Sequence, residues 1–383
     1  MTPAESDDAA RRHASYYGAI LATADGFYLK GGDSIMRGLA LFDTEWGNIQ
    51  AGQAWAEANA AKDQEGAKLC SGYAAWGADI LSLRQHPRQQ IRWREAALAS
   101  ARQLKDRAAE GRQLGNLGLS YYSLGDYRRA IEAYEQHLAI AREIGDRRSG
   151  GNALGNLGLA YRNLGDYRRA IEHYEEVLAI FREIGDRRGE GEALGSMGVA
   201  YRNLGEYRRA TEYQEQALAI AREIGDRRSE AVTLGNLGNA YAAVGETRRA
   251  IEYHEKALLI DREIGDRLGE GQDLGNLGNV YAGLGDYRRA IENYYQRLTI
   301  GREISDARGE GNALWNMSLV LDKLGDRKKA IEQAEAALKI FEQIEDPGAE
   351  TVRRQLDSLR SSEPGTTKQE PHEPTSSHFP RKK

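Results

Sequence analysis

Residues 155–174 read GNLGLAYRNLGDYRRAIEHY, and related stretches return along the chain at a spacing of 40 residues. Residues 71–110 keep this register but lose most of the pattern. Close copies start at Gly115, Gly195, Gly235 and Gly275, and an eroded copy, WNMSLVLDKLGDRKKAIEQA, starts at Trp315. A fixed period of this length indicates a repeat architecture, in which one supersecondary unit stacks on the next.

Each repeat contains two helical patterns. In the quoted copy, apolar residues recur at intervals of three and four up to Leu164, and a second such series starts at Tyr167. Gly165 is placed to end the first helix, and Asp166 is placed to cap the second. The sequence therefore predicts an all-α fold, an α-solenoid of antiparallel helix pairs.

Five positions of the repeat carry a resemblance to a known family. Leu157, Gly158, Tyr161, Ala170 and Tyr174 fall at the signature spacing of the tetratricopeptide repeat. The 40-residue form resembles the repeats of Leu-Gly-Asn/Pins adaptors, which act in spindle orientation, and the arrays of bacterial STAND-type signalling proteins. The resemblance implies a right-handed superhelix and a binding scaffold rather than an enzymatic activity.

The predicted organisation has five parts. Residues 1–70 resemble the helical segment that precedes the repeats in STAND-type ATPases, although the sequence contains no phosphate loop of the form G-x-x-x-x-G-K-[ST]. The parts are a helical N-terminal cap (1–70), a degenerate repeat (71–110), five regular repeats (111–310), a degenerate C-terminal repeat with a capping helix (311–360) and a disordered tail (361–383).

Composition narrows the classes of function. The formal net charge of −5 and the pI near 5.9 argue against a nucleic-acid binder. The single cysteine, Cys70, excludes an internal disulfide. No apolar run is long enough to span a membrane, and the N-terminus lacks a signal-peptide core, so a cytoplasmic protein is expected. No catalytic motif or metal-ligand spacing is present, so we expect neither an enzyme nor a cofactor or metal site.

The glycines of the repeat have different predicted roles. Gly158 is expected to pack against the small residue Ala170, so that the two helices approach closely. Gly155 and its equivalent Gly235 are expected on the groove that the first helices line, where a ligand backbone approaches a surface without side chains. Close packing against the neighbouring repeat is the alternative for these two positions.

Next to this glycine runs an asparagine at the 40-residue spacing. A carboxamide donates and accepts hydrogen bonds, so it suits a peptide backbone of any sequence. In the alternative interpretation, each amide bonds a backbone group of the adjacent repeat. The candidates are Asn116, Asn156, Asn236, Asn276 and Asn316, with Asn239 and Asn279 as further polar groups in two later repeats.

Charge varies along the predicted groove. Tyr122 precedes Arg162 and Arg202 at equivalent positions, and these two arginines suit the carboxylates of a partner. Arginines in the DRR turns between repeats are expected to pair locally instead.

Three hypotheses for function follow. The first is an adaptor whose concave groove binds a peptide segment of a partner protein, with an acidic linear motif. The second is a detached sensor of a STAND-type signalling system. The third is self-association of near-identical repeats, end to end.

Overall fold

The computed structural model describes residues 3–30, 34–344, 346 and 348–361, and these residues form helices and short turns. The chain divides into two compact units, Met1–Val244 and Gly245–Lys383. The boundary falls between the two helices of one 40-residue repeat. Most of the predicted disordered tail, residues 362–383, lies outside the described residues.

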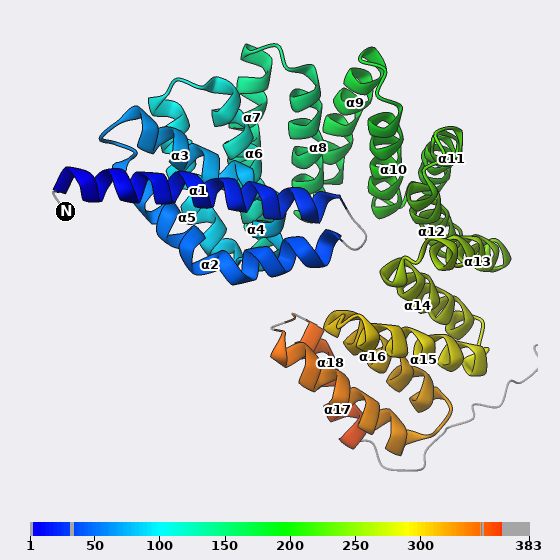
Figure 1. Cartoon of the computed structure of the whole chain (residues 1–383). Helices are drawn as coiled ribbons and strands as arrows, with labels where there is room; N and C mark the ends of the chain where they lie inside the picture. Colours follow the sequence, from blue (N-terminus) through cyan, green and yellow to red (C-terminus); the bar gives the residue numbers. More distant parts are fainter. Residues whose placement is uncertain (1–2, 31–33, 345, 347, 362–383) are drawn as a thin grey trace, which may run out of the picture. The chain divides into compact units, whose positions relative to one another are not determined.

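Unit 1 consists of an N-terminal helical segment followed by repeat helix pairs (Figure 1). Its helices are α1 (Pro3–Leu29), α2 (Ser34–Asn59), α3 (Gln64–Trp76), α4 (Ala78–Arg84), α5 (Pro87–Gln103), α6 (Arg107–Ser123), α7 (Tyr127–Glu143), α8 (Arg147–Asn163), α9 (Tyr167–Glu183), α10 (Arg187–Asn203), α11 (Tyr207–Glu223) and α12 (Arg227–Ala243).

The N-terminal segment has its own apolar core. The long helices α1 and α2 pack against each other along their length, and α3 packs on both (Figure 1). Leu21, Ile49 and Tyr73 are fully buried between them, and the Tyr73 hydroxyl donates to the Ala14 carbonyl at 2.7 Å. Trp93 of α5 belongs to the same core, which joins this segment to the repeats.

From α6 onward, each helix of unit 1 packs mainly on its neighbours in the chain, and α5 packs on α3 and α6. The pairs α6–α7, α8–α9 and α10–α11 are the predicted two-helix repeats. Gly165 follows α8 with a φ of +81°, and the Asp166 side chain accepts a hydrogen bond from the Arg169 backbone at 3.2 Å. A glycine adopts this left-handed conformation without a steric penalty, so the sequence ends α8 and starts α9 within three residues.

The packing at Gly158 differs from the prediction. A Cβ atom at this position would lie 2.5 Å from the Tyr174 ring rather than against Ala170. The same glycine–tyrosine contact joins Gly118 to Tyr134. Glycine is needed because the second helix presents an aromatic ring here. Burying a tyrosine covers roughly 150–250 Å², which at about 25 cal/mol per Å² outweighs the glycine cost of about 1 kcal/mol.

Unit 2 continues the same alternation of helices. Its helices are α13 (Thr247–Ile264), α14 (Arg267–Gly283), α15 (Tyr287–Glu303), α16 (Ala307–Lys323), α17 (Arg327–Gln343) and α18 (Gly348–Ser361). Tyr294 is buried against Gly278 as Tyr174 is against Gly158. The final helix, α18, buries Val352, Leu356 and Leu359 against α17 and so covers the end of the unit.

Both units are therefore α-solenoids built from antiparallel helix pairs, the predicted fold class. Among the described helices, none combines the length and the hydropathy that crossing a membrane requires.

Candidate functional site

The first helices of successive repeats in unit 1, α6, α8, α10 and α12, form one face of that unit, here called the first-helix face. Two cavities open on it. One lies between α8 and α10 and has a volume of about 410 Å³, and the other lies between α10 and α12 and has a volume of about 470 Å³. The second helices α9 and α11 supply the floor of the respective cavity.

The cavity between α8 and α10 contains two of the predicted site residues, Gly155 and Asn156. A Cβ atom at Gly155 would meet no neighbouring atom within 4 Å, so space is open above this part of the helix. Val177 and Phe181 of α9 form the floor. A ligand backbone therefore has room to approach α8 here.

The equivalent glycines are not equally open. A Cβ atom at Gly115 would lie 2.9 Å from the His137 ring, and Gly235 is buried in α12. The difference comes from the residue that the second helix places beneath the glycine, which is a histidine in α7 and a valine in α9. A side chain therefore covers the first-helix face at Gly115, whereas the face is open at Gly155.

The predicted asparagines of unit 1 carry free amides. Asn116, Asn156 and Asn236 are half-buried, and their side chains form no hydrogen bond with any residue that the structure describes. Asn239, one turn beyond Asn236, is also half-buried. Within the described residues, then, these three amides do not bond the backbone of the adjacent repeat, which was the alternative interpretation.

Arg162 and Arg202 lie near each other at the C-terminal ends of α8 and α10. Burial lowers the pKa of Arg202, and the positive charge of Arg162 lowers it further. Neither guanidinium pairs with a carboxylate among the described residues. Tyr122 of α6 lies beside Arg162 and accepts a hydrogen bond from the Asn163 amide at 2.7 Å. The face thus contains two like charges without a counter-ion.

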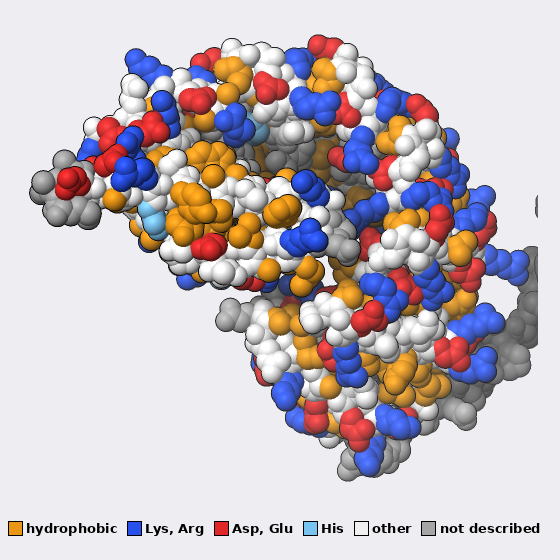
Figure 2. Space-filling view, in the orientation of Figure 1, with side chains coloured by type: hydrophobic (Ala, Val, Ile, Leu, Met, Phe, Trp, Pro, Cys, Tyr) orange, Lys and Arg blue, Asp and Glu red, His pale blue; other side chains and the backbone are white. Residues whose placement is uncertain are grey.

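The turn arginines behave differently. Arg182 donates to Glu190 at 2.8 Å, and Arg187 pairs with both Glu190 and Glu223. Similar pairs recur at other turns, and acidic and basic side chains are intermixed over the surface drawn in Figure 2. These cations are already neutralised locally, unlike those of Arg162 and Arg202.

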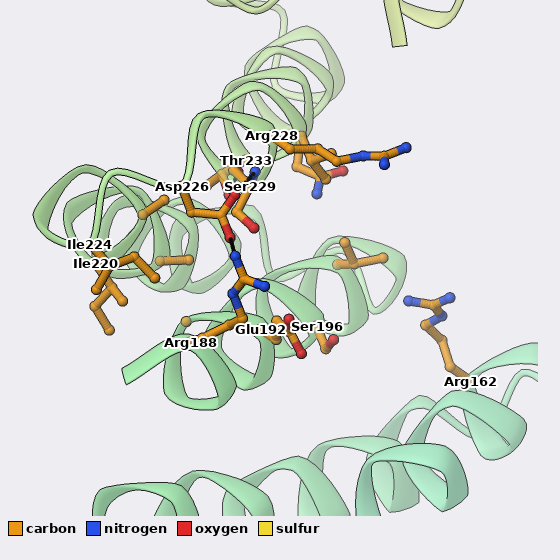
Figure 3. A pocket seen from close by; sticks show the side chains of 17 residues that line it. Arg162, Arg188, Glu192, Ser196, Ile220, Ile224, Asp226, Arg228, Ser229 and Thr233 are labelled. Carbon is orange, nitrogen blue, oxygen red and sulfur yellow. Dashed lines mark hydrogen bonds and ion pairs between the residues drawn. The ribbon is translucent and has the colours of Figure 1, made fainter. Parts of the chain in front are cut away.

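The cavity between α10 and α12 was not predicted from the sequence. Gly195, Ser196 and Asn236 contribute to it, and Arg162 reaches towards it from α8 (Figure 3). Its lining combines polar and charged residues with an aliphatic part, which is formed by Val199, Ala217, Ile220, Ala221, Ile224 and Val232. The signal in the sequence was the pair of alanines in α11, at positions where α9 has valine and phenylalanine.

Unit 2 has a polar cavity of its own, of about 410 Å³, between α14, α15 and α16. Asn276, Asn279 and Asn316 line it together. The Asn316 amide donates to the Asn279 side-chain oxygen at 3.1 Å, and the Tyr294 hydroxyl donates to the same oxygen at 2.8 Å. The Asn276 amide has no hydrogen bond to a described residue. Two of the three predicted amides are therefore already engaged.

Comparison with known protein families agrees with this repeat geometry. Tetratricopeptide repeat models match residues 151–223, 229–303 and 274–343, and another match covers residues 113–148. Together the matches cover more than half of the chain. The chain belongs to the tetratricopeptide repeat family. No curated protein is significantly similar to it in sequence.

Solved structures of tetratricopeptide repeat proteins and related folds resemble this one. A STAND signal-transduction ATPase with a tetratricopeptide repeat sensor from Pyrococcus horikoshii has 17% identity and a TM-score of 0.58, over 94% of this chain and 55% of that chain. A Rap protein complexed with Competence and Sporulation Factor has 14% identity and a TM-score of 0.55, over 89% and 98%. BtubC from P. vanneervenii has 24% identity and a TM-score of 0.51, over 57% and 92%.

At these identities the likeness shows the fold alone. This chain spans about half the length of the STAND protein. Tetratricopeptide repeats are interaction scaffolds, and stacked helix pairs of this kind present extended binding surfaces. A reaction mechanism does not follow from the fold, so the role of the first-helix face has to be argued from its side chains.

Proposed function

We propose that this tetratricopeptide repeat protein is a cytoplasmic, non-enzymatic adaptor, and that the first-helix face of unit 1 binds an extended peptide segment of a partner protein. The free amides of Asn116, Asn156 and Asn236 bond the peptide backbone. Arg162 and Arg202 pair with acidic side chains of the peptide.

One observation carries this proposal. Among the residues that the structure describes, the half-buried amides of Asn116, Asn156 and Asn236 form no hydrogen bond, and the guanidinium groups of Arg162 and Arg202 lack the carboxylate partner that Arg182 has. A half-buried polar group without a partner costs free energy, and a ligand that supplies the partner recovers it. The two arginines repel each other as well, so a carboxylate between them relieves an unfavourable interaction.

One of the similar solved structures contains a bound factor, which supports a binding role for this fold. The Rap protein structure contains Competence and Sporulation Factor, a bound factor on a repeat fold that resembles 89% of this chain. The cavity between α8 and α10 offers room beside Gly155 for a backbone to approach Asn156. In this chain the Asn and Arg positions named above are the proposed contacts.

A charge-reversal experiment tests the proposal. A fluorescent peptide is first selected from a random dodecapeptide library on the immobilised full chain, and its Kd is measured by fluorescence anisotropy. We expect the double variant R162E/R202E to weaken binding at least tenfold, about 1.4 kcal/mol, because two attractive contacts become repulsive.

The matched control is R168E/R208E, which changes the same net charge in the same two repeats. Arg168 and Arg208 are exposed on the second helices, away from the proposed contacts. The control is expected to change Kd less than threefold at physiological salt, since exposed charges are screened. Equal weakening by both double variants would mean that net charge, not the first-helix face, governs binding.

The STAND sensor is a second candidate. The fold likeness to the STAND protein extends over 94% of this chain, and residues 1–70 resemble the segment that precedes the repeats in such proteins. In this case the partner is a separate ATPase, and co-purification of an ATPase with the tagged chain from its native cells is the expected result. Self-association stays a prediction that light scattering against concentration tests.

A further inference from the structure

The floor beneath the first-helix face changes from repeat to repeat at two positions. In α9 these positions hold Val177 and Phe181, and in α11 they hold Ala217 and Ala221. The Phe181 ring fills the space between the first helices on either side of it. Cβ atoms at Gly151 and Gly189 would lie only 3.0 Å and 2.6 Å from that ring.

Two alanines fill less of this space. The cavity above them, between α10 and α12, has a volume of about 470 Å³, against about 410 Å³ for the cavity above Val177 and Phe181, and it is here called the α11 pocket. Ile220 and Ile224 extend its lining along α11, and Val232 contributes from α12. Val232 is 60% exposed, which places a branched aliphatic side chain in solvent beside the opening. Exposed apolar surface of this kind, rimmed by polar groups, is typical of a binding site.

The charges around this pocket distinguish its two sides. Arg188 pairs with Asp226 at 2.8 Å and is neutralised (Figure 3). Glu192 also lines the pocket, and burial raises the pKa of its carboxyl. Arg162, which has no carboxylate partner among the described residues, approaches from α8. An acidic ligand group is therefore favoured beside Arg162 and disfavoured next to Glu192, which is exposed on α10.

We infer that this pocket anchors one large apolar side chain of the partner peptide, of leucine size or larger, with an acidic residue of the same peptide held by Arg162. The inference rests on the proposed function and adds the identity of the anchor. The aliphatic lining of the pocket favours an apolar side chain of the peptide, and the charge of Arg162, which has no carboxylate partner among the described residues, determines where the acidic residue of the peptide lies.

The chain itself supplies a variant that fills the space directly above Ala217 and Ala221. The triple substitution A217V/A221F/S229G copies into α11 and α12 the residues Val177, Phe181 and Gly189, which pack together one repeat earlier. Ser229 has to become glycine because it is equivalent to Gly189, where a Cβ atom would lie 2.6 Å from the Phe181 ring. A milder second variant, V232N, changes an exposed residue to the asparagine found at position 152.

Selection from a peptide library then shows which peptide residues each variant prefers. Random dodecapeptides displayed on phage are selected on the immobilised wild-type chain, on the triple variant and on R162E. Wild type is expected to enrich peptides in which a large apolar residue lies within a few positions of an acidic one. Peptides selected on the triple variant should still contain the acidic residue but no longer the large apolar one. Peptides selected on R162E should contain the large apolar residue but no longer the acidic one.

Affinities measured by anisotropy complete the test. A peptide selected on wild type is expected to bind the triple variant at least tenfold more weakly and V232N severalfold more weakly, with thermal unfolding used to confirm that each variant is folded. Acidic peptides without an apolar preference, or equal affinity of the selected peptide for wild type and the folded triple variant, would overturn the anchor and leave the proposed function standing. If wild type enriches no peptide, the proposed function itself fails.

Discussion

At the scale of single residues, two glycines on α8 that are three positions apart have opposite environments. Gly158 faces the ring of Tyr174, which is 3% exposed. Gly155 faces open space above Val177. Glycine lowers the stability of the helix by the same amount at both positions, but only at Gly158 does a neighbouring side chain occupy the space that a Cβ atom would need. Substitution by alanine therefore separates the two roles.

We expect G158A to lower the free energy of unfolding by about 1–2 kcal/mol, since overpacking typically costs 1–3 kcal/mol and alanine regains part of it through helix propensity. G155A is the matched control in the same helix. It should raise the free energy of unfolding by up to about 1 kcal/mol, the propensity difference alone. Urea unfolding followed by circular dichroism measures both.

These two variants belong to one unfolding transition because both residues lie in α8. A G158A protein as stable as wild type would mean that the Tyr174 ring has room to move, and that the glycine is not required for packing. A destabilised G155A would mean that a neighbour covers this site.

At the scale of elements, the adjacent helices α13 and α14 share a buried polar cluster. His254 is fully buried, and its Nδ1 lies 2.8 Å from an Asp273 carboxylate oxygen. Asp261 is also buried on α13. Burial and the nearby charge of Asp273 raise the pKa of Asp261 to about 7, with Asp266 and Glu270 adding smaller contributions. Position 261 is alanine or phenylalanine in the repeats of unit 1.

A raised carboxyl pKa makes stability fall as pH rises. Between about pH 4 and pH 7 the folded state holds a proton on Asp261 that the unfolded chain releases, so the cost of ionising it grows through this window and is complete above pH 7. We expect D261N, which keeps the shape and a donor to Asp273, to stabilise unit 2 by about 2 kcal/mol at pH 8 and by less than about 0.5 kcal/mol at pH 4.

Thermal unfolding of D261N and wild type across this pH range measures the difference. A gain that is the same at pH 4 and pH 8 would contradict a titrating Asp261 and would point to packing instead.

The elements themselves could be predicted from sequence because their causes are local. Apolar spacing, Gly165 and Asp166 determine where α8 ends and where α9 begins, and all three are visible in one repeat. The prediction that Gly158 packs against Ala170 was wrong, because this contact depends on which side chain of the second helix extends to the first helix. The pocket above Ala217 and Ala221 depends on three helices together, so no single stretch of sequence reveals it.

At the scale of the whole molecule, the chain has two units, and each has its own set of polar groups on its first helices. Among the described residues, the side chains of Asn279 and Asn316 in unit 2 are bonded to each other and Asn276 is free, whereas Asn116, Asn156 and Asn236 of unit 1 form no side-chain hydrogen bond. Together with Arg162 and Arg202, this difference supports unit 1 as the place of the proposed peptide site. The central claim is therefore one of location, namely that a peptide lies along the first-helix face.

Photo-cross-linking tests this location most directly. A peptide selected on the wild-type chain carries one benzophenone, and mass spectrometry identifies the residues of the full-length protein that it labels. We expect labelling within the stretches 152–163, 192–203 and 229–239 of α8, α10 and α12, and loss of this labelling in R162E/R202E. Labelling confined to the second helices α7, α9 and α11, or to the N-terminal helices α1–α5, would contradict it.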